Sequence, residues 1–161
     1  MGAASATFSL ERSNAYRAIF WGGLIAGVMD LTAAFVTSGL RGVGPIRIMQ
    51  SIASGLLGAD AFKGGFKTAA LGVVLHFLIA TVATSVYYAA SRKLGLLVRQ
   101  AIVCGILYGV AVYLFMYLIV LPNSAVPFKI SRTLSAVATG LAIHIICVGL
   151  PISLAVRRFS K

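Results

Sequence analysis

Long uninterrupted runs of apolar residues dominate the chain, and short polar segments separate them. Four runs reach the roughly 20 residues that an α-helix needs to cross about 30 Å of hydrocarbon. They cover residues 18–40, 68–90, 101–121 and 134–156. Only helices satisfy every backbone polar group within such a segment. The pattern therefore predicts an all-α membrane protein whose four transmembrane helices form a bundle.

A shorter helical pattern occupies the connection between the first two runs. Over residues 46–57 the apolar residues recur at helical spacing, and Arg47, Gln50, Ser51 and Ser54 fall on the opposite face. The segment is too short to span a bilayer. It predicts an amphipathic helix that lies on the membrane surface or caps the bundle. The transmembrane domain then covers residues 18–156, between a polar segment at 1–17 and a basic tail at 157–161.

Composition agrees with this assignment and excludes a soluble domain. The chain is 60% hydrophobic and 11% charged, whereas soluble domains are roughly 45–50% apolar and about 25% charged. The chain contains 14 Lys and Arg residues and only three acidic residues, which gives a net charge of +11. The basic residues flank the apolar runs and no basic stretch has interleaved aromatics. We therefore expect contact with anionic lipid headgroups and no nucleic-acid partner.

The basic residues also predict an orientation. Eight lie on the side of the two termini and six on the other side, and the eight occupy shorter segments. The positive-inside rule then places both termini in the cytoplasm. The eight are Arg12, Arg17, Arg92, Lys93, Arg99, Arg157, Arg158 and Lys161.

The apolar runs contain repeated glycine motifs. The first and third each hold GxxxGV, and the second and fourth each hold GxxxH. This order suggests a duplicated helical hairpin. Small residues let membrane helices approach closely, so we expect the motif glycines to pack helices together, with leftover glycine faces available for a homo-oligomer. These glycines are Gly23, Gly27, Gly72, Gly105, Gly109 and Gly140.

Polar residues of the apolar runs fall at one depth. Asp30, His76 and His144 lie about eight to ten residues from the outer ends of their helices, or roughly 12–15 Å below the boundary at 1.5 Å per residue. Tyr113 reaches a similar level. An aspartate at a helix centre costs about 2.5–3.5 kcal/mol on insertion scales. We therefore expect Asp30 to pair with His76 or His144, or to face a polar cavity.

Three interpretations of this cluster stay open. The residues could be hydrogen-bonding contacts that fix the register of the bundle. They could line a cavity that binds or passes a small solute, a proton or a cation, since histidine titrates near neutral pH. They could also hold a metal, either as two histidines and one carboxylate on a divalent ion or with His76 and His144 as axial ligands of a b-type haem.

Catalysis has no positive support in the sequence. No nucleophile, base and orienting group can be placed together, so we do not expect an enzyme. Cys104 and Cys147 both lie inside apolar runs at different depths, and they form neither a redox motif nor an expected disulfide.

One stretch of sequence carries a resemblance. Residues Met49–Gly58, followed by Gly64-Gly65-Phe66 and then GVVLHFLIA, resemble small four-helix bacterial inner-membrane proteins of the YagU-like type. The resemblance extends over residues 18–156. It implies a location in the bacterial inner membrane and carries no site residues over to this chain.

Overall fold

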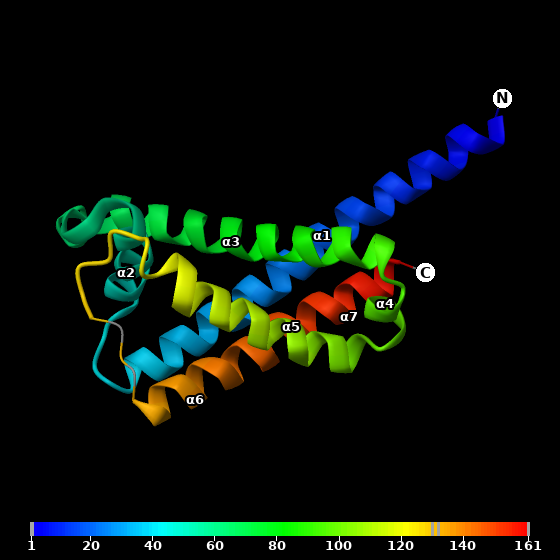
Figure 1. The fold of residues 1–161 in the computed structure, drawn as a ribbon. Helices are drawn as coiled ribbons and strands as arrows, with labels where there is room; N and C mark the ends of the chain where they lie inside the picture. Colours follow the sequence, from blue (N-terminus) through cyan, green and yellow to red (C-terminus); the bar gives the residue numbers. More distant parts are fainter. Residues whose placement is uncertain (1, 130, 132, 161) are drawn as a thin grey trace.

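The computed structural model describes residues 2–129, 131 and 133–160, with side chains described from Asn14 onward. All regular structure in this part of the chain is helical, and the long helices form one elongated bundle (Figure 1). The elements in chain order are α1 (Gly2–Gly39), α2 (Pro45–Leu57), η1 (Gly58–Lys63), α3 (Gly65–Lys93), α4 (Leu96–Arg99), α5 (Ala101–Phe115), η2 (Met116–Val120), α6 (Leu134–Ile143), η3 (His144–Gly149) and α7 (Leu150–Phe159).

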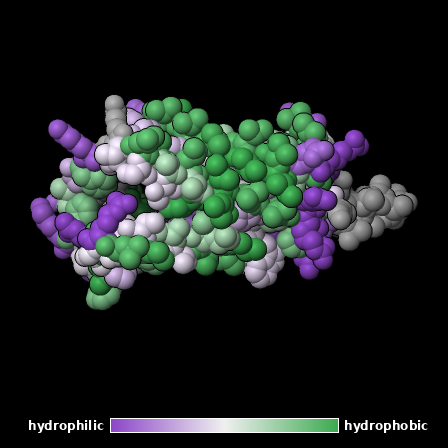
Figure 2. Space-filling view, turned by 90° about the horizontal axis from the view of Figure 1, so that it is seen from below, coloured by the Kyte–Doolittle hydropathy of each residue, from purple (hydrophilic) through white to green (hydrophobic). Residues whose placement is uncertain are grey.

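The four predicted transmembrane helices are confirmed. Helical segments long and apolar enough to cross a membrane cover Asn14–Gly39, Gly65–Lys93, Ala101–Val120 and Leu134–Phe159. Figure 2 shows a broad hydrophobic surface in the middle of the molecule and hydrophilic residues toward both ends. An outward-facing apolar band between two polar ends is what a bilayer requires. The chain is therefore a multi-pass integral membrane protein.

Two of the described spanning helices change from α to π geometry part-way along. The π segments η2 and η3 each end two residues before a proline, Pro122 and Pro151. Proline lacks the backbone N–H and its ring crowds the carbonyl four residues earlier. Those carbonyls belong to Leu118 and Cys147, inside the π segments. At Pro151 the disturbance takes the form of a π segment in a helix that continues as α7.

The predicted short helix is present as α2, but its faces differ from the prediction. Part of the apolar face is buried, yet Gln50 and Ser54 are buried with it while Leu56 is exposed. The Gln50 side-chain nitrogen donates to the Gly65 carbonyl at 3.1 Å. Because α2 packs against the spanning helix α3, its polar side chains find partners inside the protein and its apolar ones can face lipid. Ile48, Met49 and Ala53 are buried and Arg47 is exposed, as the pattern predicted, so the departure is confined to Gln50, Ser54 and the exposed apolar residues.

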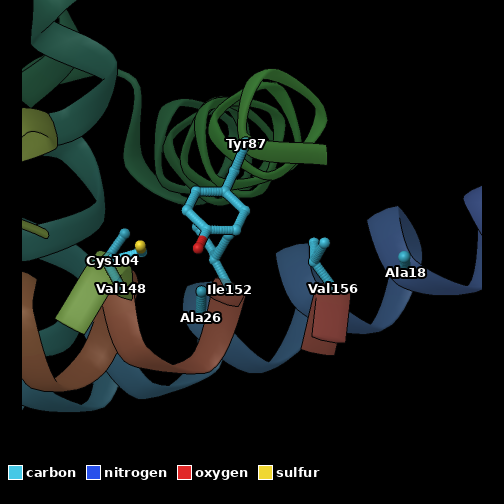
Figure 3. Packing of buried hydrophobic residues seen from close by; sticks show 7 residues of the cluster. All are labelled: Ala18, Ala26, Tyr87, Cys104, Val148, Ile152 and Val156. Atoms are coloured by element: carbon cyan, nitrogen blue, oxygen red, sulfur yellow. The ribbon is translucent and has the colours of Figure 1, made fainter. Parts of the chain in front are cut away.

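The core lies where α1, α3, α5 and the last helix meet. Closely packed neighbours are α1 with α3, α1 with α7, and α5 with both η3 and α7. Figure 3 shows the ring of Tyr87 reaching from α3 toward Ile152 on α7. The seven buried residues of this cluster are Ala18, Ala26, Tyr87, Cys104, Val148, Ile152 and Val156.

Two tyrosines connect α3 and α5 within this core. The rings of Tyr87 and Tyr108 meet edge-on with centroids 4.9 Å apart. The Tyr108 hydroxyl donates to the Ala83 carbonyl at 2.6 Å, and the Tyr87 hydroxyl donates to the Leu97 carbonyl at 3.0 Å. Buried hydroxyls require such partners. The Tyr108 bond joins α5 to α3, and the Tyr87 bond joins α3 to α4.

The motif glycines of α1 lie against α3. A β-carbon at Gly23 would be 3.0 Å from the Cα of Thr81, and one at Gly27 would be 2.7 Å from the ring of Phe77. Gly72 of α3 lies against the main chain of Met49 in α2. These glycines therefore sit where two helices approach each other closely.

The motif glycines of the second half lie against the last helix in a similar register. A β-carbon at Gly109 would be 2.6 Å from the Cα of Ile145, and one at Gly105 would be 3.1 Å from the carbonyl oxygen of Gly149. Ile145 and Gly149 follow His144 by one and five residues, as Phe77 and Thr81 follow His76.

Candidate functional site

A partly open cavity of about 490 Å³ lies inside the bundle. Its walls come from α1, α2, α3, α5, η2, η3 and the segment 121–128. Asp30, His76 and His144 all line this cavity, each half-buried. Tyr113 does not line it. Three of the four predicted site residues are thus brought to one space from three different helices.

Asp30 lines this cavity from α1. Among the described residues, no hydrogen bond or ion pair reaches its carboxylate. His144 and Val148 of η3 line the same cavity, which places Asp30 near the last helix. The expected pairing of Asp30 with His76 or His144 does not occur in the described structure, because each histidine bonds to a main-chain carbonyl instead.

His76 connects α3 to α1. Its Nε2 lies 2.8 Å from the Gly27 carbonyl oxygen. A carbonyl oxygen can only accept, so Nε2 carries the hydrogen and donates. In the neutral ring the other nitrogen, Nδ1, is then left with a free lone pair. Gly27 has no side chain, and a β-carbon there would lie 2.7 Å from the Phe77 ring. The glycine therefore lets α3 come close enough to α1 for this hydrogen bond.

His144 bonds within its own helix. Its Nδ1 donates to the Gly140 carbonyl at 2.8 Å, four residues earlier, so Nε2 is the nitrogen left free in the neutral ring. Tyr113 meets this ring edge-on at 5.4 Å and stacks on Tyr117 at 5.6 Å. Tyr113 is buried and packs beside Gly140. It therefore supports the His144 ring from behind the cavity wall.

The wall beyond these residues is mostly apolar. Ala26 comes from α1, Leu75 and Ile79 from α3, Val112 from α5, and Val148 from η3. A few polar groups set in an apolar wall are typical of sites that bind small molecules. The arrangement can hold a small ligand with an apolar part and a polar or charged group.

One end of the cavity is covered by α2 and the segment 121–128. Gly55 of α2 accepts a hydrogen bond from the Ala125 backbone N–H at 2.9 Å. Ser51 and Ser124 line the cavity from these two segments. Sequence reasoning offered a capping role for the short helix but missed the 121–128 segment. Only its position after a spanning helix and its two prolines could have drawn attention to it.

The metal interpretation gains no support from this geometry. Across the described residues, no three His, Cys, Asp or Glu side chains form a group that could hold a metal ion. A haem would need both free imidazole nitrogens on opposite sides of one flat ring. His76 and His144 line a common cavity. No contact among the described residues shows their free nitrogens on opposite sides of a shared plane.

Comparison with protein-family models, with curated proteins and with solved structures finds no match to this chain. The resemblance to YagU-like proteins therefore stays a prediction.

Proposed function

We propose that this membrane protein binds a small, positively charged solute in the cavity and lets that solute or a proton pass through the bundle. The observation that carries the proposal is Asp30, which lines the cavity and has no hydrogen-bond or ion-pair partner among the described residues. An aspartate at the centre of a membrane helix costs about 2.5–3.5 kcal/mol on insertion scales. A cation bound beside it would offset this cost.

The two histidines support a ligand of the same kind. Their anchoring N–H groups are used by Gly27 and Gly140, so in the neutral form their remaining nitrogens can only accept hydrogen bonds. With the carboxylate, the site then offers acceptors from three helices. A small alkylammonium ion fits these requirements, because its N–H groups donate and its hydrocarbon part suits the apolar wall.

A binding experiment tests this proposal. Isothermal titration of n-butylammonium into the protein in nanodiscs should show binding, with empty nanodiscs correcting for partition into lipid. Asp30→Asn should weaken binding about tenfold or more, because a hydrogen bond to a charged group contributes about 1.5–3 kcal/mol. Uptake of the same ion into proteoliposomes then tests passage separately from binding.

The matched control is Asp60→Asn, because Asp60 is an exposed aspartate outside the cavity. That variant should bind n-butylammonium as the parent protein does. n-Butanol and butyrate have the same alkyl chain without the positive charge. Equal binding of all three compounds, or unchanged binding after Asp30→Asn, would contradict the proposal.

A structural role without any ligand is the second candidate. The His76 bond to Gly27 joins two spanning helices, and polar groups of this kind stabilise membrane bundles by themselves. If Asp30→Asn and His144→Ala change thermal stability but neither binding nor passage, this candidate is favoured.

We also propose the bacterial inner membrane as the location, with both termini in the cytoplasm and possible self-association through glycine faces. The similar register of glycine contacts in the two halves supports the duplicated hairpin. A reporter fused after Lys161 tests the orientation, since a periplasmic signal would reverse it.

A further inference from the structure

A second hollow lies on the outer surface, away from the cavity. This groove has a volume of about 580 Å³ and runs between α1 on one side and η3 with α7 on the other. Its walls are apolar along most of their length, and Arg158 lines it at one end. The residues that matter here are Trp21, Ile25, Met29, Leu154 and Arg158.

The groove is long enough to cross one lipid leaflet. The wall formed by η3 and α7 extends from Ile146 to Phe159, which is about 20 Å at 1.5 Å per residue. One leaflet contributes half of the roughly 30 Å hydrocarbon core, or about 15 Å. Ile25, Met29 and Leu154 are each more than a third exposed along it. A single acyl chain can therefore lie along the groove from the membrane surface to the midplane.

The charge at the groove's end matches a phosphate. Arg158 lines the groove and is exposed. Arg17 reaches the same end, because its guanidinium carbon lies 5.9 Å from the centroid of the Phe159 ring, another lining residue. Neither described aspartate lines the groove. Arginine binds phosphate oxygens with two parallel hydrogen bonds, and Trp21 supplies the indole common at the headgroup level.

We propose that this groove is a binding site for one anionic phospholipid. The acyl chain lies between α1 and α7, and the phosphate lies at Arg158 with Arg17 nearby. The lipid belongs to the leaflet on the side of the two chain ends. This site is separate from the cavity, so it does not depend on the function proposed above.

Trp21 makes the site directly measurable. It is the only tryptophan of the chain and it lines the groove. Lipids brominated on the acyl chain quench tryptophan fluorescence on contact. In phosphatidylcholine vesicles holding the full-length protein, brominated phosphatidylglycerol at low mole fraction should quench Trp21 more strongly than brominated phosphatidylcholine at the same fraction. The relative association constant should favour the anionic lipid about fivefold for each arginine engaged.

Neighbouring arginines provide a matched pair of variants. Arg158→Gln should remove about fivefold of the preference, whereas Arg157→Gln should keep it, because Arg157 is exposed but does not line the groove. Equal quenching by both lipids in the parent protein would overturn the proposal. Equal losses in the two variants would also overturn it, since that result indicates general attraction to a basic surface.

Discussion

The two halves of the bundle share a glycine and histidine pattern but use their histidines differently. In each half, the second glycine of the GxxxG pair lies against the residue that follows the histidine, Phe77 in one and Ile145 in the other. Yet His76 bonds across to α1, whereas His144 bonds to its own helix. The shared motif therefore marks where two helices pack together. The hydrogen-bond partner of the histidine depends on the local geometry of its helix.

That local geometry differs because prolines lie in or just after the spanning helices of the second half, whereas the spanning helices of the first half contain none. The segments η2 and η3 end near Pro122 and Pro151, while α3 remains α-helical throughout. The contact after the histidine differs as well. Gly149 lies directly against the main chain of Gly105 and Gly109, and Thr81 holds the corresponding place in the first half. The second glycine of the pair thus meets main chain in the second half, where Gly109 lies against Ile145, and a side chain in the first, where Gly27 lies against the Phe77 ring.

The largest effect should come from filling the main-chain contact. A β-carbon at Gly149 would meet the Gly109 backbone, with its Cα at 2.7 Å, and that backbone has no free rotation to move away. Gly149→Ala should therefore destabilise the protein by about 3 kcal/mol, the upper end of the usual cost of overpacking. Gly27→Ala should cost about 1 kcal/mol, because the Phe77 ring can turn. Thermal unfolding in detergent measures the loss of stability in both variants. Equal losses would contradict the proposed difference between the two halves.

The next effect distinguishes the two histidines. His76→Leu removes a hydrogen bond between helices and should cost about 0.5–1 kcal/mol more than His144→Leu, which removes a bond within one helix. Chemically matched rescues sharpen the test. His76→Gln places a donor near the Nε2 position and His144→Asn places one near Nδ1, so each should recover part of the loss. If His144→Leu is the more damaging change, the assignment of roles is wrong.

The smallest effect concerns a segment that only the first half contains. In η1 the exposed side chains of Asp60 and Lys63 form a 2.8 Å ion pair. The hydrogen bond and charge of Lys63 lower the pKa of Asp60 below its ordinary value of 3.8, and the pKa of Lys63 is raised by the same pair. Because the folded pKa of Asp60 is lowered, the pair stabilises above the ordinary pKa and is lost as the pH falls through the folded one.

Lys63→Met should therefore raise the Asp60 pKa toward 3.8 in an NMR titration, while the unfolding temperature stays nearly constant, since exposed ion pairs contribute little. A clear loss of stability at neutral pH would show that η1 supports the first hairpin more than its exposure indicates.

The spanning helices could be predicted from the sequence because a helix needs about 20 apolar residues to cross a membrane. It also identified Asp30, His76 and His144 as residues of similar depth, and all three line one cavity. The faces of α2 could not be predicted in the same way. Apolar periodicity does not show which polar residues of a helix find partners inside the protein, and Gln50 is buried because it donates to the Gly65 carbonyl.

The partners of the histidines were also beyond sequence reasoning. Each ring binds a main-chain carbonyl, and every residue carries one, so no side-chain pattern identifies which carbonyl is used. The expectation of an Asp30 pair rested on charge alone. The structure satisfies the imidazoles through Gly27 and Gly140 instead, and this leaves the carboxylate to the cavity.

The way the imidazoles are tethered has a consequence for any charge they acquire. His76 donates a hydrogen bond to Gly27, and His144 donates one to Gly140. Each donating N–H is present whether the ring is neutral or cationic. Proton uptake at the second nitrogen therefore requires no rotation of either ring and breaks neither tether. The positive charge of a protonated ring is therefore compatible with the same two hydrogen bonds.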